Sequence, residues 1–253
     1  MQNPVNRFKA AIAAGQSQIG VWNSIGGNTA CEVLASAGFD WVLVDTEHAA
    51  TSTAEVLPAL QAIAGYPDVS AIVRPASNDE VTIKRVLDMG AQTLLIPYVQ
   101  NVDEARAAVA AMRYAPRGIR GMAGVMRATR FGAVENYADT VEAQLCLIVQ
   151  VETIEAMAQL EDIAQVDGVD AVFIGPADLS ASMGLPGQTG HPDVVAVIDQ
   201  AIARLKSIGV PAGILATNQD SAAHFIAQGT TFTAVGVDSM MLVQAARDLR
   251  AGF

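Results

Sequence analysis

The sequence predicts an α/β fold, a closed (βα)8 barrel preceded by one helix, and three observations lead to this expectation. A chain of 253 residues with 51% hydrophobic and 16% charged side chains can bury one large core. Strand-like apolar runs alternate about eight times with Ala-rich amphipathic stretches. Five of the runs read WVLV, SAIV, TLLI, LCLIV and AVFI, the composition of parallel strands buried on both faces. Short links between the units favour a closed barrel over an open doubly wound sheet, with residues 1–253 forming a single domain.

The expected elements follow this rhythm along the chain. A leading helix is expected over residues 4–15. Strands are expected at 19–24, 41–45, 70–74, 93–97, 145–151, 171–175, 211–215 and 232–236. Helices between them are expected at 53–64, 79–89, 102–113, 153–165, 192–208 and 219–228. Glycines that tolerate positive φ are expected to end helices at Gly38, Gly90, Gly168, Gly209 and Gly229.

One connection, residues 114–136, is too long for an ordinary loop. It carries Arg117, Arg120, Arg127 and Arg130 among several glycines. An anion-capturing lid, a subunit contact and a plainly solvated loop all remain open for it.

Composition excludes several classes of protein. Fifteen basic and 26 acidic residues give a formal net charge of −11, which repels phosphate backbones and argues against nucleic acid as a partner. Charges, Gly or Pro interrupt every apolar run well before the roughly 18 residues of a membrane span, so no membrane partner is expected. The first residues lack the apolar core of a signal peptide, and we expect a cytoplasmic protein. Cys31 and Cys146 have no metal-ligand spacing and are expected to be inert core residues.

Polar side chains stand just past several of the apolar runs, where a parallel barrel builds its active site. Glu152 follows the fifth expected strand and Asp178 the sixth, so their carboxylates should meet at the rim. Two hard oxygen donors suit Mg²⁺ or Mn²⁺ with open positions for substrate. The alternative is that Glu152 caps a helix and Asp178 starts a turn.

Asp45 and His48 come just after the second expected strand, and His48 is the one histidine at a rim position. An Asp that accepts a hydrogen bond from an imidazole raises its basicity, which suits a general base. Glu47, between them, is interpreted as an outward-facing ion-pair residue outside the catalytic set. Arg74, held extended by Pro75, could stabilise an anionic oxygen or form a structural ion pair.

The chain resembles the HpcH/HpaI aldolases, metal-dependent class II pyruvate aldolases with a (βα)8 TIM barrel of the phosphoenolpyruvate/pyruvate superfamily. The most specific matching stretches are G-F-D-W-V-L-V-D-T-E-H-A at 38–49 and F-I-G-P-A-D-L-S at 173–180. Further matches are R-P at 74–75, L-L-I-P-Y-V at 94–99, Y-A-P-R-G-I-R-G at 114–121, V-Q-V-E-T at 149–153, G-I-L-A at 213–216 and A-V-G-V-D at 234–238. They span nearly the whole chain in order.

The resemblance implies a role for each matching position. Glu152 and Asp178 match the metal carboxylates, Arg74 the arginine that binds the pyruvyl oxygen, and His48 with Asp45 the proton-handling dyad. Substrate-binding positions are matched by Gln150, Ala177, Leu215, Trp22 and Asp88, with Trp22 a bulky rim residue near the aldehyde and Asp88 contributed from a neighbouring subunit. Relatives are homo-oligomers, typically hexamers. The implied cofactor is a divalent ion, Mg²⁺ or Mn²⁺ first and Co²⁺ or Zn²⁺ as alternatives.

The implied reaction is reversible retro-aldol cleavage of a 4-hydroxy-2-oxo acid, such as 2-dehydro-3-deoxyglucarate or 4-hydroxy-2-oxoheptanedioate, to pyruvate and an aldehyde through the pyruvate enolate. The residues independently disfavour a Schiff-base aldolase, because Lys9, Lys84 and Lys206 all lie in helix-like stretches and none ends a strand. The alternatives are a CoA-ester lyase of the citrate lyase β-subunit type, a phosphoenolpyruvate mutase-like or hydrolytic enzyme, and a non-catalytic binding barrel.

Overall fold

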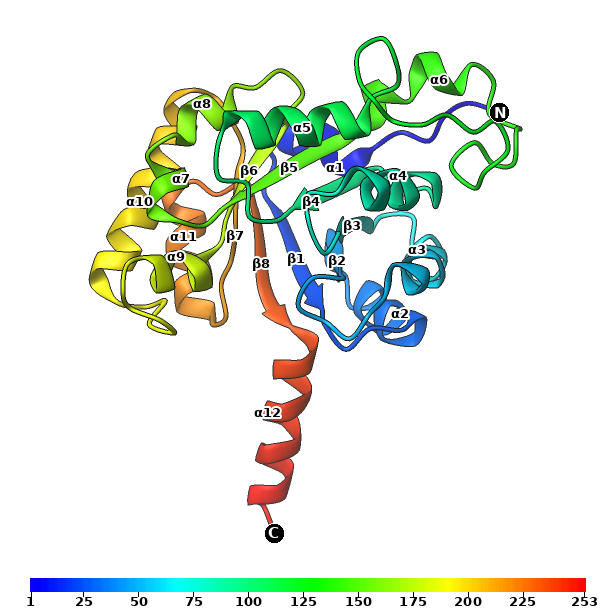
Figure 1. Ribbon diagram of the computed structural model, residues 1–253. Helices are drawn as coiled ribbons and strands as arrows, with labels where there is room; N and C mark the ends of the chain where they lie inside the picture. Colours follow the sequence, from blue (N-terminus) through cyan, green and yellow to red (C-terminus); the bar gives the residue numbers. More distant parts are fainter.

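The computed structural model describes residues 1–253, in which eight parallel strands close into a barrel in chain order (Figure 1). The strands are β1 (Gln18–Asn23), β2 (Trp41–Asp45), β3 (Ser70–Arg74), β4 (Thr93–Ile96), β5 (Cys146–Val151), β6 (Ala171–Ile174), β7 (Ala212–Leu215) and β8 (Phe232–Val237). All eight expected strands are confirmed to within one or two residues at each end. The barrel closes because β8 pairs with β1 in parallel.

The helices surround the barrel and return the chain from one strand to the next. They are α1 (Arg7–Ala13), α2 (Asn28–Ser36), α3 (Val56–Ile63), α4 (Glu80–Asp88), α5 (Val102–Met112), α6 (Tyr137–Thr140), α7 (Ile154–Met157), α8 (Leu160–Ala164), α9 (Pro176–Ser182), α10 (Pro192–Ser207), α11 (Gln219–Gln228) and α12 (Asp238–Ala251), with short 3-10 turns η1 (Thr53–Glu55) and η2 (Glu142–Gln144). The five glycines expected to end helices all adopt positive φ. None of the helices is both long and apolar enough to cross a membrane.

The helix expected at 153–165 is wrong as one continuous element, since it divides into α7 and α8. Arg204 donates a hydrogen bond from Nη1 to the carbonyl oxygen of Met157, the last residue of α7. That carbonyl is satisfied from α10, and Gln159 adopts non-helical backbone angles at the break. A side chain distant in sequence therefore ends a helix that local pattern alone would continue.

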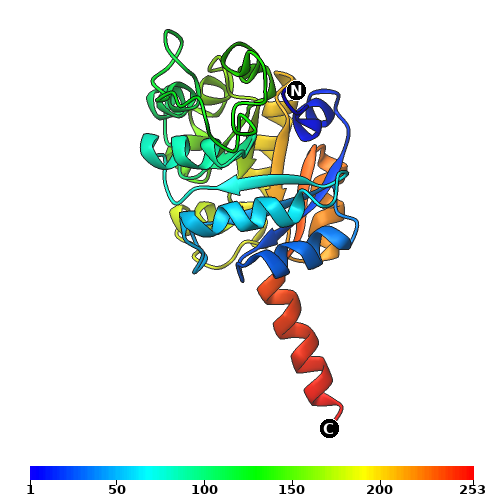
Figure 2. The same ribbon diagram turned by 90° about the vertical axis from the view of Figure 1, so that its right-hand side faces the viewer.

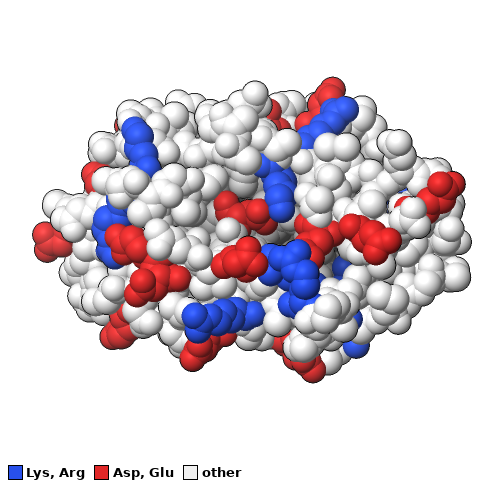
Figure 3. All heavy atoms as spheres, turned by 90° about the horizontal axis from the view of Figure 1, so that it is seen from above, with Lys and Arg blue, Asp and Glu red and all other residues white.

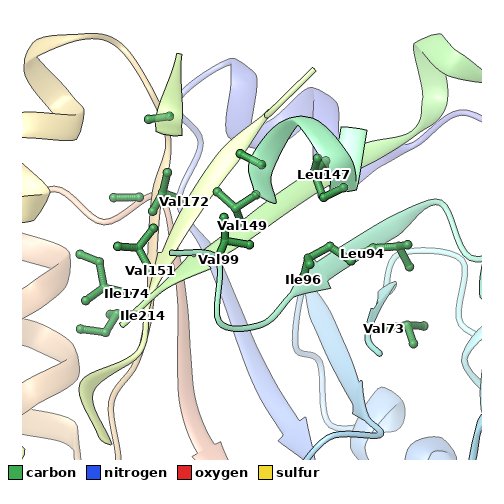
Figure 4. Packing of buried hydrophobic residues seen from close by; sticks show 14 of the residues in the cluster. Val73, Leu94, Ile96, Val99, Leu147, Val149, Val151, Val172, Ile174 and Ile214 are labelled. Atoms are coloured by element: carbon green, nitrogen blue, oxygen red, sulfur yellow. The ribbon is translucent and has the colours of Figure 1, made fainter. Parts of the chain in front are cut away.

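The core has two layers because successive strand residues point to opposite faces. Inside the barrel, Trp41 and Phe232 pack with Phe8 of α1, whose ring lies 5.5 Å from Phe232, so the leading helix plugs the amino-terminal end. Outside the barrel, the other face of each strand packs against the helices (Figure 4). Both cysteines are free and buried, as expected. Charged side chains are thereby confined to the strand ends and the surface.

The last helix, α12, departs from this arrangement. It continues from the end of β8 and projects away from the barrel instead of folding back over β8 and β1 (Figures 1 and 2). Asp238 anchors its first turn, accepting hydrogen bonds from Asn23 Nδ2 at 2.7 Å and from the Ser24 amide at 2.8 Å. Every residue from 240 to 253 is exposed. The outer ring of helices thus lacks, from its own chain, the member that follows the eighth strand.

Candidate active site

The register of β2 and β3 places Asp45 beside Arg74 at the carboxyl ends of both strands. The two form a buried fork, in which Arg74 donates from Nε to Asp45 Oδ1 at 2.9 Å and from Nη2 to Oδ2 at 2.6 Å. The guanidinium carbon lies 4.9 Å from the centre of the Trp22 ring, and Trp22 Nε1 donates to Asp45 Oδ2 at 3.3 Å. Burial would raise the pKa of Asp45, but the hydrogen bonds and charge of Arg74 outweigh it and lower the pKa. The guanidinium is therefore held in one orientation with N–H groups left for a ligand.

Glu152 lies one residue beyond β5 and is only 2% exposed. Its carboxylate accepts a hydrogen bond from Gln150 Nε2 at 2.6 Å and one from the Tyr98 amide at 2.9 Å. Gly175 follows the neighbouring β6, and a Cβ at this position would overlap Glu152 Oε2. Burial raises the pKa of Glu152 to about 7; the charges of Asp178 and Glu47 add to this, while the two hydrogen bonds oppose it.

Asp178 stands in the first turn of α9, directly after β6, and its charge acts on both Glu152 and Glu47. No group of three or more His, Cys, Asp and Glu side chains is gathered in a metal-binding arrangement. The candidate donors are the carboxylates of Glu152 and Asp178, and Oε1 of Gln150, whose Nε2 bonds Glu152, is buried without a hydrogen-bond partner. Carboxylate oxygens are hard donors, and two of them concentrate negative charge at one place. Such a site, with few protein ligands, fits a Mg²⁺ or Mn²⁺ ion that keeps positions open for water or substrate.

Glu47 corrects one interpretation made from the sequence. Its side chain is not outward-facing; it is 16% exposed and turned toward Arg74, whose Nη1 lies 2.9 Å from Oε2. Burial raises the pKa of Glu47, and the charges of Asp45 and Asp178 raise it further against the opposing effect of Arg74 and His48. Glu47 therefore belongs to the charged cluster at the barrel mouth.

His48 lies exposed at the edge of this cluster, with 66% of its side chain accessible. The carboxylate oxygen near its ring is Glu47 Oε2, at 3.8 Å from Nε2. Asp45 accepts instead from the backbone amides of Glu47 at 3.0 Å and His48 at 3.4 Å, and no Asp45 contact to the imidazole is present. The proton-handling pair of His48 and Asp45 stays a prediction.

The expected substrate-binding residues fall into two groups. Gln150 is buried on β5, Leu215 is the half-buried last residue of β7, and Ala177 is exposed in the first turn of α9, so all three lie at the carboxyl ends of strands. Trp22, expected on the rim near the aldehyde, is 4% exposed and lies under Arg74, with its ring 5.5 Å from that of Phe173. Its role in substrate binding stays a prediction.

Asp88 is not part of the site in its own chain. It ends α4 on the amino-terminal side of the barrel, and its Oδ1 accepts from Arg120 Nη2 at 2.8 Å. Its expected role at a neighbouring subunit's site stays a prediction.

The segment 114–136 also lies away from the site, beside the amino terminus (Figure 1). The Met1 amino group donates to the Ala133 carbonyl at 2.9 Å, and the Ala128 amide donates to the Asp88 carbonyl at 3.1 Å. A lid over the site of its own chain is therefore excluded for this segment. Its exposed apolar side chains are Ile119, Met122, Val125 and Phe131.

Sequence reasoning missed one contributor altogether, the backbone of Tyr98. This residue has a φ of 54°, a left-handed conformation that is uncommon for a non-glycine residue, and it presents its amide to Glu152. Only the position of Tyr98 directly after the β4 run and Pro97 hinted at a role.

The family model described as HpcH/HpaI aldolase/citrate lyase matches residues 18–245. The chain belongs to the HpcH/HpaI aldolase/citrate lyase family. It is 59% identical over 253 residues to a pyruvate aldolase of Rhizobium etli, covering 100% of this chain and 99% of that protein. It is 55% identical to a hydroxypyruvate/pyruvate aldolase of Sagittula stellata, covering 99% of each chain.

Two further likenesses extend this result. A 4-hydroxy-2-oxo-heptane-1,7-dioate aldolase of Escherichia coli is 50% identical, with 98% of this chain and 95% of that protein covered. A crystal structure of an HpcH/HpaI aldolase/citrate lyase family protein from Burkholderia cenocepacia superposes with a TM-score of 0.94 at 36% identity, covering 98% and 99% of the two chains. The family and these full-length likenesses show that the chain is a carbon–carbon lyase, which excludes a non-catalytic barrel.

Proposed function

We propose that this chain is a metal-dependent class II aldolase that cleaves 4-hydroxy-2-oxo acids reversibly to pyruvate and an aldehyde. The observation that carries the proposal is the juxtaposition of the Glu152 and Asp178 carboxylates with the forked Arg74 at one end of the barrel. All three lysines lie on helices, Lys9 in α1, Lys84 in α4 and Lys206 in α10, so no amine is placed at a strand end for Schiff-base chemistry.

Each residue has a task that its position supports. Glu152 and Asp178 would hold the divalent ion, which when bound polarises the keto group of the 2-oxo acid and favours the enolate. Arg74 donates its free N–H groups to the C2 oxygen as negative charge develops there. His48, exposed at the mouth, accepts the proton of the C4 hydroxyl while the C3–C4 bond breaks, and the bond electrons pass to the enolate. In the addition direction His48 returns that proton to the new alkoxide.

The structure suggests a supporting role for Glu47 in this scheme. Its carboxylate stands between the His48 ring and Arg74, so it can stabilise the imidazolium that forms when His48 takes a proton. Asp45 is already occupied by Arg74 and Trp22 and serves mainly to orient the guanidinium.

The decisive experiment combines purified protein, Mg²⁺ or Mn²⁺, pyruvate and a panel of aldehydes, followed by EDTA. Aldol product that disappears with EDTA and returns with added metal supports the proposal. Turnover that survives EDTA and is trapped by borohydride would contradict it, and cleavage of a CoA ester without aldol activity would favour the citrate lyase type. Glu152→Gln should abolish product formation, whereas Glu155→Gln, the same change at an exposed position on α7, should not.

We further propose that the active form is a homo-oligomer, a hexamer as the family resemblance implies, assembled in part through α12. This helix and the two residues after it expose large apolar side chains that are between 42% and 96% accessible, a surface typical of a protein–protein contact: Met240, Met241, Leu242, Val243, Leu249 and Phe253. In a second copy, its own α12 also does not fold back over β8 and β1, so α12 of the first copy can pack there. Deleting residues 240–253 should therefore give a smaller species in sedimentation velocity while the far-ultraviolet circular dichroism of the barrel persists; an unchanged sedimentation coefficient would contradict this.

A further inference from the structure

A cavity of about 240 Å³ lies at the amino-terminal end of the barrel, opposite the candidate active site. Its wall is formed by the segment before α1, the end of α3 with the start of β3, residues 90–93 before β4, and the long segment 114–136. A smaller adjoining cavity of about 60 Å³ shares Gly90, Ala91, Gln92, Arg127 and Arg130 with it. The two form one hollow beneath the amino-terminal residues.

The charged residues of this hollow all have the same sign. Arg7, Arg127 and Arg130 are the charged residues of the larger cavity, and Arg127 and Arg130 those of the smaller one, with no Asp or Glu in either lining. This is unusual in a chain of net charge −11. Figure 3 looks onto this end of the molecule and shows acidic and basic side chains interspersed across it. A neighbouring cavity of about 460 Å³, for example, has more acidic than basic residues in its lining.

Two of these arginines have no carboxylate partner. Arg7 is paired with the exposed Asp68 at 2.7 Å, but neither Arg127 nor Arg130 forms an ion pair. Arg127 donates one hydrogen bond, from Nη1 to the Met89 carbonyl at 2.6 Å, which fixes its guanidinium at the cavity wall. Burial lowers the pKa of Arg127, and the nearby charge of Arg130 lowers it further, so the two cations repel each other. Asp88 lines a separate cavity together with Arg127, but its Oδ1 accepts a hydrogen bond from Arg120 Nη2.

A polar donor without a partner provides a second, independent observation. The Nδ2 atom of Asn3, which lines the smaller cavity, is buried and donates to nothing. A buried N–H group without an acceptor costs free energy. An anion bound beside Arg127 and Arg130 would accept a hydrogen bond from Asn3 Nδ2, and it would also neutralise the charge of the two arginines.

We propose that this hollow is a binding site for a small, multiply charged anion, of the phosphate or dicarboxylate type, held by Arg127 and Arg130. The two cavities, of about 240 and 60 Å³, together reach only the lower end of the range of about 300–1,000 Å³ typical of sites for drug-sized ligands, which favours a compact anion over a nucleotide. Guanidinium groups bind phosphate and carboxylate oxygens through charge-assisted hydrogen bonds. The site gives the Arg-rich segment 114–136 a role distinct from catalysis.

The test titrates inorganic phosphate and, separately, succinate into the full-length protein by isothermal calorimetry, in EDTA and at constant ionic strength set with chloride. We expect one saturable site per chain with a dissociation constant of about 1 mM or tighter for one of the two anions. Competition between them identifies which charge arrangement is preferred. Failure of both to bind saturably would overturn the proposal.

Variants distinguish this hollow from the barrel mouth. Arg130 is exposed and forms no ion pair or side-chain hydrogen bond, so Arg130→Gln should leave the fold intact, and it should weaken anion binding about tenfold or more. Arg127→Gln should do the same. The matched control is Arg106→Gln, an exposed arginine paired with Asp103, which should leave binding unchanged.

Equal anion affinity in Arg130→Gln and the unmodified chain would refute the proposal. So would a smaller sedimentation coefficient for Arg130→Gln with unchanged phosphate affinity, because Arg130 would then pair with a carboxylate of a neighbouring copy.

Discussion

Replacing Glu152 by Gln removes the buried charge on which the site depends and should stabilise the metal-free protein above neutral pH. Burial raises the pKa of Glu152 from 4.5 to about 7, so the folded state holds its proton more tightly than the unfolded state. At about 1.36 kcal/mol per unit, the free energy of unfolding of the metal-free protein loses about 3 kcal/mol between pH 4.5 and 7 from this group alone. The neutral amide of Gln does not titrate, so the free energy of unfolding of the variant does not fall in this way.

The sign of the effect follows from linkage. Below pH 4.5 Glu152 is protonated in both states, and the variant and the unmodified chain should be equally stable with respect to this group. As the pH rises to 7 the unmodified chain should become the less stable of the two, and above about pH 8 the difference should level off near 3 kcal/mol.

The assay is urea denaturation in EDTA at pH 5, 6, 7 and 8, at one fixed protein concentration because oligomers unfold in a concentration-dependent way. Glu155→Gln serves as the control and should show no such trend. Added Mn²⁺ should reverse the order, stabilising the unmodified chain and leaving Glu152→Gln unchanged. A Glu152→Gln protein that is less stable at pH 8, or a difference that does not vary with pH, would refute the reasoning.

Three further changes test the assigned roles. His48→Ala should lower kcat for aldol cleavage by about 10²- to 10⁴-fold while Mn²⁺ affinity, measured by electron paramagnetic resonance, stays constant; the same substitution at His191 is the control, and unchanged turnover would remove His48 from the base role. Arg74→Lys keeps the charge but loses the fork, so steady-state kinetics should show kcat/KM falling about 10²-fold or more; a fall of less than threefold would indicate a purely structural arginine. Gly175→Ala should displace the Glu152 carboxylate and weaken Mn²⁺ binding about 10- to 100-fold, whereas Gly190→Ala, where a Cβ meets no atom within 4 Å, should not, and equal affinities would contradict the close approach.

The barrel could be predicted because its pattern is local. Runs such as WVLV and TLLI are buried on both faces, so a charge can appear only where the strand ends. The first polar residue after each run therefore indicates both the end of the strand and the position of the site. The placement of Asp45 beside Arg74 follows from strand register, which the sequence implies once the barrel closes.

Other features could not be predicted because they depend on contacts between distant segments. Glu47 sits in the same short stretch as Asp45 and His48, and only the position of Arg74 on the next strand decides that it turns inward. The division between α7 and α8 depends on Arg204 of α10. Trp22 packs against Phe173 of β6 and lies under Arg74 of β3, contacts that a motif comparison does not reveal.

The outward course of α12 also bears on how the enzyme can be handled. A tag or fusion partner joined after Phe253 would lie beyond the tip of α12, on the helix that we propose packs against a second copy. Dilution should favour dissociation of the proposed oligomer and leave the 14-residue α12 exposed to water, where isolated helices of this length are only marginally stable. The helix that completes each barrel would then come from the second copy, and it would be lost when the two copies dissociate.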